Sequence, residues 1–169
     1  LFDELVSYAW LNGEPGIAFE DAWQRTNPLP GLGPLCATNP CGEQVLHPYD
    51  NCNLGSLNLA VLVKKGKADS TIREASGRAG SPQVDWRRLE FATKTATRML
   101  DNVIDLFDFP VPAVTELAQK NRRIGLGIMG FADMLYQLGV QYNSREGYAV
   151  ADKVMSFIQD VAYKTSRAL

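Results

Sequence analysis

The residues best suited to chemistry gather in one short segment, Ala37-Thr38-Asn39-Pro40-Cys41-Gly42-Glu43-Gln44. An amide, a thiol and a carboxylate stand at alternate positions in it, at Asn39, Cys41 and Glu43. Alternate residues of an extended segment point the same way, so one pocket could hold all three groups. Pro40 and Gly42 stiffen and tighten the chain between them. A plain turn stays open as an alternative on this spacing alone, because Asn-Pro and Cys-Gly are common turn dipeptides.

The cysteines and the single histidine raise two other kinds of site. Cys36, Cys41, Cys52 and His47 are residue types that bind zinc, but no Cys-x-x-Cys pair occurs, so the spacing argues against a metal site. Cys41 with His47 could indicate a cysteine hydrolase, although a lone histidine in a Leu-His-Pro-Tyr turn is more often a structural or surface residue. Cys36 is interpreted as a small, buried apolar residue.

A glycine motif and an arginine pair occur later in the chain. Gly125, Gly127 and Gly130 match Gly-x-Gly-x-x-Gly, but a dinucleotide site needs a strand before the motif, and residues 118–123 are polar and helical. Close backbone packing or a wall near a substrate is therefore the favoured interpretation. Arg122 and Arg123 could face a phosphate, yet a solvated or salt-bridged pair is favoured. The four methionines are interpreted as core.

Hydrophobic periodicity and capping signals predict the elements that must position these residues. Helices are expected over 1–11, 20–25, 85–107, 113–120, 131–138 and 144–169, and strands over 17–19 and 52–63. Gly13 and Gly139 should end the helices before them, and Ser144 should cap the last helix. The long helix should begin after Asp85 and bury one face, formed by Leu89, Ala92, Ala96, Met99, Val103 and Phe107. Residues 64–83 are polar and glycine-rich, which indicates an exposed insertion. Strands separated by long helical stretches favour an α/β fold.

Composition sets the broad class. The chain has 169 residues, of which 46% are hydrophobic and 21% charged, as expected for one globular domain. A net charge of -2 gives no basic excess for nucleic acid. The longest charge-free stretch, 26–42, carries four prolines and three glycines, so no membrane span is expected. Three cysteines and no secretion signal favour a reducing, cytoplasmic location. The helical patterns at both ends indicate an internal piece of a larger protein.

Two motifs in succession carry a family resemblance. Asn39-Pro-Cys-Gly-Glu-Gln44, followed by Cys52-Asn-Leu-Gly-Ser-Leu-Asn-Leu59, resembles the catalytic core of class II, adenosylcobalamin-dependent ribonucleotide reductases. Further blocks follow the family order and cover nearly the whole chain except 64–83: Gly13-Glu-Pro-Gly16, Asn27-Pro28, Asp85-Trp86, Leu100-Asp-Asn-Val-Ile-Asp105 and Asn121-Arg-Arg-Ile-Gly-Leu-Gly-Ile-Met-Gly-Phe-Ala-Asp133. In the related class I large subunit the site more often reads Asn-Leu-Cys, with the second cysteine further away.

The resemblance implies a fold and a role for each site residue. The family carries its reactive cysteine on a finger loop inside a ten-stranded α/β barrel, so residues 1–169 would form part of that barrel domain. Cys41 would lose a hydrogen atom to a radical derived from adenosylcobalamin and, as a thiyl radical, take the 3′ hydrogen of a ribonucleotide. Glu43 would act as general base on the 3′ hydroxyl. Asn39, with Thr38 and Gly42 beside it, would bind the substrate.

The same resemblance implies the redox chemistry and the partners. Cys52 would be one member of a redox-active disulfide whose other cysteine lies upstream of this chain. A thioredoxin-like or glutaredoxin-like protein would reduce that disulfide. The complete enzyme would convert ribonucleoside diphosphates or triphosphates to deoxyribonucleotides for DNA synthesis, respond to nucleotide effectors and form a homodimer. The large subunit of a class I reductase and a non-catalytic remnant remain the alternatives.

Overall fold

The computed structural model describes residues 1–64 and 82–169, which divide into two compact units. The first unit combines Leu1–Cys52 with Phe109–Asn121, and the second combines Asn53–Asp108 with Arg122–Leu169. The predicted insertion at 64–83 lies almost entirely outside the described residues. Only its two ends are described, and they join a short antiparallel ladder in which Lys64 pairs with Gln83.

The first unit holds three helices and a hairpin. It contains α1 (Phe2–Asn12), α2 (Glu20–Arg25), the 3-10 helix η1 (Pro30–Leu32), the strands β1 (Ala37–Thr38) and β2 (Val45–Leu46), and α4 (Pro112–Asn121). As predicted, α1 ends at Gly13, which has a φ of 80°. The predicted strand at 17–19 is wrong. Ile17 and Phe19 are exposed and join no ladder among the described residues, and an apolar run without a pairing neighbour does not form a strand.

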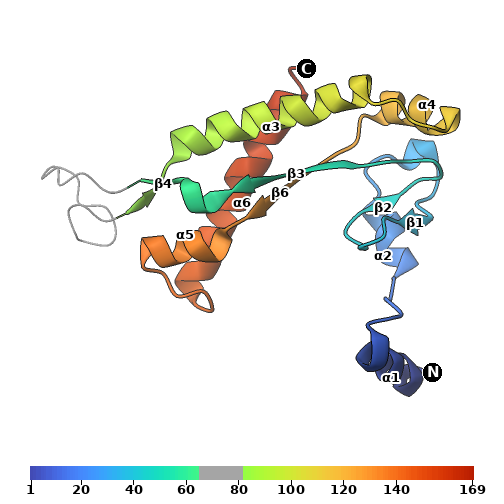
Figure 1. The fold of residues 1–169 in the computed structure, drawn as a ribbon, viewed down its shortest axis with the longest axis horizontal. Helices are drawn as coiled ribbons and strands as arrows, with labels where there is room; N and C mark the ends of the chain where they lie inside the picture. The colour runs from blue at the N-terminus through green and yellow to red at the C-terminus, as the bar shows by residue number, and fades with distance from the viewer. Residues whose placement is uncertain (65–81) are drawn as a thin grey trace, which may run out of the picture. The chain divides into compact units, whose positions relative to one another are not determined.

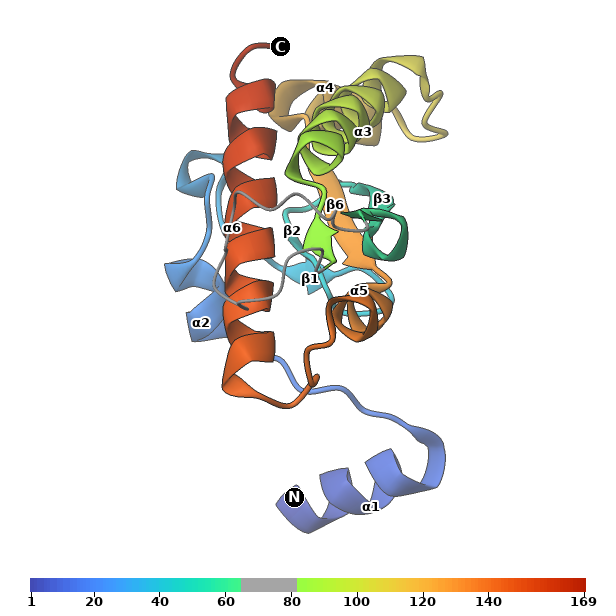
Figure 2. The same ribbon diagram turned by 90° about the vertical axis from the view of Figure 1, so that its left-hand side faces the viewer.

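The second unit is built on two parallel strands, β3 (Asn53–Asn58) and β6 (Ile124–Met129), in register from Asn53↔Ile124 to Asn58↔Met129. A parallel pair requires a long crossover connection, and α3 (Trp86–Leu106) forms its main helix. Figures 1 and 2 show α3 packed along this pair and α6 (Arg145–Ser166) crossing α3. The other elements are η2 (Leu59–Val61), β4 (Val63–Lys64), β5 (Gln83–Val84) and α5 (Phe131–Leu138). The α/β class is therefore confirmed.

The strand predicted over 52–63 is confirmed only in its first half. β3 ends at Asn58, whose side-chain Oδ1 accepts a hydrogen bond of 3.1 Å from the Ala60 amide and so starts the 3-10 turn η2. Leu57 and Leu59 are buried, whereas Val61 is exposed. Leu57 and Leu59 belong to the core of this unit, whose buried members are Leu57, Leu59, Leu62, Val84, Leu89, Met134, Val154 and Ile158.

The long helix begins where the sequence predicts, and the face that it buries only partly matches the predicted one: Leu89 is buried and Ala92 and Ala96 pack against the core. The Asp85 carboxylate accepts a hydrogen bond of 3.1 Å from the Arg88 amide, which confirms the N-cap. The buried residues of α3 are Leu89, Thr93, Thr97, Leu100 and Ile104, while Met99 and Phe107 of the predicted face are exposed. Two threonines fit the core because each hydroxyl donates to the carbonyl four residues earlier, at 2.8 and 2.9 Å. Apolarity alone therefore identified the first half of the buried face but missed the two threonines and placed Met99 and Phe107 in it.

Local signals placed the later helix ends correctly. Gly139 ends α5 with a φ of 71°, and the Ser144 hydroxyl accepts a hydrogen bond of 3.0 Å from the Gly147 amide at the start of α6. The methionine prediction is mostly wrong, because Met134 is buried but Met99, Met129 and Met155 are exposed. Within the described ranges, every helix is too short or too polar to cross a membrane.

Candidate active site

Cys41 lies at the tip of a hairpin in the first unit. β1 and β2 pair antiparallel through Ala37↔Leu46 and Thr38↔Val45, and residues 39–44 connect them. The Gly42 amide donates to the Asn39 carbonyl at 3.0 Å, which makes a four-residue turn with Pro40 and Cys41 in its middle positions. The Cys41 side chain is exposed at this turn. The predicted loop-tip position of the cysteine is therefore confirmed.

Asn39 closes the loop below the cysteine, a role that the sequence did not suggest. Its amide donates to the Gln44 carbonyl at 3.1 Å, and its side-chain Oδ1 accepts from the Gln44 amide at 2.9 Å. The Asn39 carbonyl already binds the Gly42 amide, so the side chain serves as the acceptor that a backbone carbonyl would supply in a regular ladder. The signal was present, since asparagine side chains often bind the backbone at turns. This bond engages Oδ1, and Nδ2 keeps its two donors.

The other residues predicted for the site lie on the same hairpin. Thr38 is on β1 and Glu43 follows the turn, and both side chains are exposed. Gly42 has a φ of 82°, in the region that favours glycine, and a Cβ there would meet no atom within 4 Å. The hairpin therefore requires glycine at this position for its backbone shape rather than for lack of space.

The other two cysteines differ in their surroundings. Cys52 immediately precedes β3 and is partly buried, which agrees with the prediction that it begins the strand. Cys36 is exposed, so its interpretation as a buried apolar residue is wrong. Its amide donates to the Leu46 carbonyl at 2.9 Å, and this backbone bond extends the hairpin while the side chain stays outside it. Cys36 and Cys41 are free thiols.

His47 is a buried structural residue. It is 3% exposed, and its Nδ1 lies 3.5 Å from Oδ2 of Asp50. Across residues 1–64 and 82–169, no group of three or more histidine, cysteine, aspartate or glutamate side chains is arranged to hold a metal ion. The packing of the 47–50 turn thus accounts for the histidine that raised the zinc and hydrolase alternatives.

The glycine motif lies on β6 rather than after a strand. Gly125 and Gly127 are inside β6, opposite Leu54 and Ser56 of β3, and Gly130 precedes α5. A dinucleotide fingerprint needs its first glycine in the turn that follows the strand, so this geometry does not form one. A Cβ on Gly130 would lie 2.6 Å from Asn58 Oδ1, which supports the interpretation of close packing.

Arg122 is salt-bridged, as favoured from the sequence. Its Nε donates to Asp101 at 2.8 Å, and its two terminal nitrogens donate to Asp105 at 2.8 and 2.9 Å. These hydrogen bonds raise the pKa of the Arg122 guanidinium above its usual value, with that to Asp105 the larger cause. The Arg122 hydrogen bond likewise lowers the pKa of Asp105. The guanidinium therefore holds the start of β6 to the last turns of α3.

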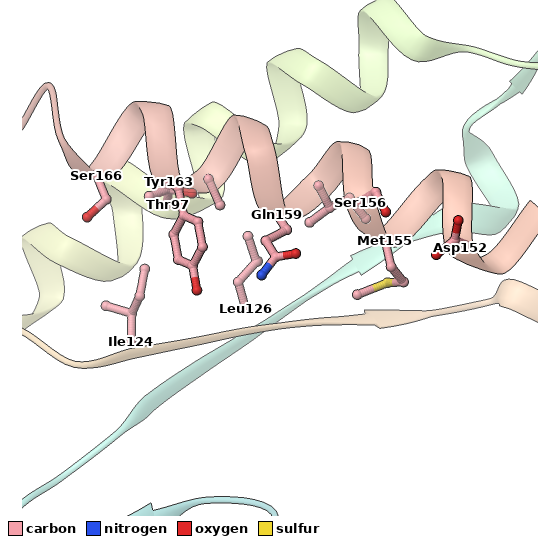
Figure 3. Close-up of a pocket in the computed structure, with 11 residues that line it drawn as sticks. Thr97, Ile124, Leu126, Asp152, Met155, Ser156, Gln159, Tyr163 and Ser166 are labelled. Atoms are coloured by element: carbon pink, nitrogen blue, oxygen red, sulfur yellow. The ribbon is translucent and has the colours of Figure 1, made fainter. Parts of the chain in front are cut away.

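A pocket of about 560 Å³ occurs between α6 and β6 of the second unit. Figure 3 shows Ile124 and Leu126 of β6 facing Met155, Gln159 and Tyr163 of α6. None of the residues predicted for the site lines this pocket. The chemistry-bearing residues are instead carried by the exposed hairpin.

Comparison with known proteins connects this hairpin to a family. The family model described as ribonucleotide reductase, barrel domain, matches residues 1–169, the whole chain. The chain belongs to the ribonucleotide reductase family. The resemblance predicted from the sequence and the assignment to a barrel domain are thereby confirmed. The described residues of this segment form an open α/β structure in which each sheet has two strands.

Several curated relatives match the reductase segment along its full length. A protein of Thermoplasma acidophilum and one of Mycobacterium tuberculosis, both named vitamin B12-dependent ribonucleoside-diphosphate reductase, are 44% and 43% identical over all 169 residues. A ribonucleoside-diphosphate reductase subunit alpha of Chlamydia pneumoniae is 30% identical over 100% of the chain and 15% of its own length. The chain spans 20% and 22% of the first two relatives, about a fifth of their length.

Proposed function

We propose that this chain is the part of a class II, adenosylcobalamin-dependent ribonucleotide reductase that carries the radical-bearing cysteine. The observation that carries the proposal is Cys41, exposed at the tip of a short hairpin, in a chain that matches the reductase barrel domain along its whole length. The names of the most similar relatives support the B12-dependent class and diphosphate substrates. Subunit alpha relatives support the class I alternative more weakly, at 30% and 31% identity.

The parallel pair supports the finer proposal of a ten-stranded barrel. In a closed barrel each strand has a neighbour on both sides. Among the described residues β3 and β6 pair only with each other, so the outer edge of each is open to a further strand. The crossover between them through a long helix is the unit from which α/β barrels are assembled.

The chemistry of Cys41 fits the cofactor of the class. Adenosylcobalamin, when bound, supplies an organic radical that can take a hydrogen atom from a thiol. That role requires an accessible thiol on this chain, and Cys41 is exposed at the tip of its hairpin. Cys41 would hold the radical on its Sγ, take the hydrogen from C3′ of the substrate and return a hydrogen there at the end of each cycle.

The other hairpin residues would handle protons and orientation. Glu43 would accept the proton of the 3′ hydroxyl as the 2′ hydroxyl takes a proton from the redox-active cysteine pair and leaves as water. Asn39 Nδ2 would donate to substrate oxygens, because its Oδ1 is engaged by the Gln44 amide. Thr38 and Gly42 flank this position on the same hairpin and would complete the substrate contacts.

Cys52 would supply reducing equivalents. Its thiol and a second cysteine outside this chain would give two electrons and two protons per turnover and become a disulfide, while one ribonucleotide becomes one deoxyribonucleotide and one water. A thioredoxin-like or glutaredoxin-like protein would reduce that disulfide by thiol–disulfide exchange. The proposal for the whole enzyme also includes a homodimer, regulation by nucleotide effectors and a cytoplasmic location.

The test compares two exposed cysteines five positions apart in the full-length reductase that carries this segment. Cys41→Ser should abolish deoxyribonucleotide formation, because an O–H bond is too strong to relay the hydrogen atom. Cys36→Ser is the matched control and should keep wild-type turnover, since Cys36 contributes only its backbone to the hairpin. Deoxyribonucleotide formation by Cys41→Ser would refute the proposed function. Turnover with B12 cofactor but without a partner subunit would separate class II from class I.

A further inference from the structure

The carboxylate of Asp50 is buried in the first unit and accepts hydrogen bonds from several residues. Its side chain has no exposed surface. Oδ1 accepts hydrogen bonds from the Asn51 amide at 2.9 Å and from Asn121 Nδ2 at 2.7 Å. Oδ2 lies 3.4 Å from the His47 amide, which donates to it, and 3.5 Å from His47 Nδ1. Burying a carboxylate is costly unless donors surround it, and here donors from three residues do so.

These contacts fix a turn and tie it to a helix. The Asp50 amide also donates to the His47 carbonyl at 3.1 Å, so residue 50 binds both ends of the 47–51 turn. Asn121 is the last residue of α4 and stands 71 positions away in the chain. Within the turn, Tyr49 has a φ of 63°, which is unfavourable for a residue other than glycine. A turn with this backbone persists when surrounding bonds determine it, and Asp50 supplies those bonds.

This turn is the connection between the two cysteines of the site. It begins directly after Leu46 of β2, the strand that leads back from Cys41, and it ends one residue before Cys52. The Asn51 amide donates a hydrogen bond of 2.9 Å to Asp50 Oδ1, and Asn51 is the residue directly before Cys52. A disulfide forms only within narrow limits of distance and direction, so the backbone of a redox cysteine must be held accurately.

We propose that Asp50 is a positioning residue that holds Cys52 at its working place relative to the hairpin of Cys41. The proposal rests on the proposed function, because it assumes that Cys52 is redox-active. Asp50 itself touches neither substrate nor cofactor in it. It acts through Cys52 and leaves the hydrogen relay at Cys41 untouched, because the hairpin has its own closing bonds through Asn39 and Gln44.

The decisive variant is Asp50→Asn in the full-length reductase that carries this segment. The substitution keeps the shape of the side chain but replaces one acceptor oxygen by an amide NH2 group, which is a donor that faces other donors, so at least one hydrogen bond of the turn is lost. Asp21→Asn is the matched control, since it makes the same charge change at an exposed position of α2 in the same unit. Asn121→Ala is a second variant that removes the Nδ2 donor to Asp50 and keeps the carboxylate.

Two activity readouts separate positioning from general destabilisation. With Asp50→Asn, hydrogen exchange between cofactor and solvent through Cys41 should stay at the wild-type rate, while multiple-turnover deoxyribonucleotide formation falls by about ten- to a hundredfold, as expected for a reacting group displaced by roughly 1 Å. Asn121→Ala should show the same split with a smaller loss. Equal losses in both readouts, or wild-type turnover in both variants, would overturn the proposal.

A third readout needs no cofactor. In the free enzyme, the rate of Cys52 alkylation should rise several-fold in Asp50→Asn, while Cys36 and Cys41 react at wild-type rates. A uniform rise at all three thiols would indicate unfolding of the unit and would count against positioning. The proposed function fails separately if Cys41→Ser retains exchange, whatever Asp50→Asn does. Full multiple turnover by Cys52→Ser would remove Cys52 from the site and would overturn the role of Asp50.

Discussion

Gly130 and Gly139 offer a matched test of why the glycine motif exists. They flank α5, and their backbones are nearly identical, with φ values of 69° and 71°. A Cβ on Gly139 would meet nothing within 4 Å. A Cβ on Gly130 would lie 2.6 Å from Asn58 Oδ1 and 3.0 Å from both the amide nitrogen and the Cβ of Ala60. Alanine at either position therefore has the cost of the left-handed backbone, and only alanine at Gly130 has the further cost of the close contacts.

The magnitudes follow from these contacts. The left-handed backbone costs alanine about 1–2 kcal/mol at either site. At Gly130 the Asn58 side chain must also turn away and give up its 3.1 Å bond to the Ala60 amide, which costs about 1 kcal/mol. The Ala60 backbone cannot turn away, and moving it by a few tenths of an ångström adds about 1–3 kcal/mol. Gly130→Ala should therefore destabilise the protein by about 2–4 kcal/mol more than Gly139→Ala.

Urea-induced unfolding, followed by circular dichroism, measures this difference directly. Asn58→Ala combined with Gly130→Ala should cost less than the sum of the two single changes, because the closest contact is gone before the Cβ arrives. Equal losses for Gly130→Ala and Gly139→Ala, within about 0.5 kcal/mol, would refute the close-packing explanation. The motif would then need another reason for its third glycine.

Two further predictions concern the hairpin and the free energy of unfolding at acidic pH. Asn39→Ala should expose the Gln44 amide and speed its hydrogen exchange about fivefold, as expected for one lost hydrogen bond, whereas Asn39→Asp keeps the acceptor and should leave that rate unchanged but impair substrate binding. The Arg122 hydrogen bond lowers the pKa of Asp105, so its contribution to stability is present above the unfolded value of about 4 and disappears as the pH falls through the lower folded value. Asp105→Asn should flatten the pH dependence of the free energy of unfolding below about pH 4. An unchanged pH dependence in this range would contradict the ion pair between Asp105 and Arg122.

Sequence reasoning located the elements whose signals are local. The Asp85 and Ser144 caps and the glycines after α1 and α5 act within a few residues of the helix ends that they set, and the observed ends agree with them. The hairpin tip was predictable for the same reason, because Pro40 and Gly42 favour a turn around Cys41.

Strand β6 was missed because nothing local makes it a strand. Its sequence, Ile-Gly-Leu-Gly-Ile-Met, contains two glycines, which weaken strand propensity. The pairing with β3, about 70 residues earlier in the chain, supplies the ladder that makes it one. The apolar run at 17–19 is the converse case, since it has suitable residues and no described partner.

The contacts of Asp50 with His47, Asn51 and Asn121 were missed for a related reason. The donor at Asn121 lies 71 positions from Asp50, and a sequence pattern of a few residues carries no sign of that contact. The exposure of Cys36 could not be predicted either, because burial depends on elements packed from elsewhere in the chain.

The hairpin's short strands explain why amide side chains surround it. β1 and β2 have two residues each, so most backbone groups near them have no ladder partner. The Gln24 side chain donates to the Leu35 carbonyl at 2.7 Å and accepts from the Leu35 amide at 3.1 Å, as a neighbouring strand would. The Asn39 side chain supplies only the acceptor, for the Gln44 amide at 2.9 Å. An amide offers both an acceptor and donors, so Asn39 can close the loop through Oδ1 and still present Nδ2 to a substrate, which a carboxylate at this position could not do.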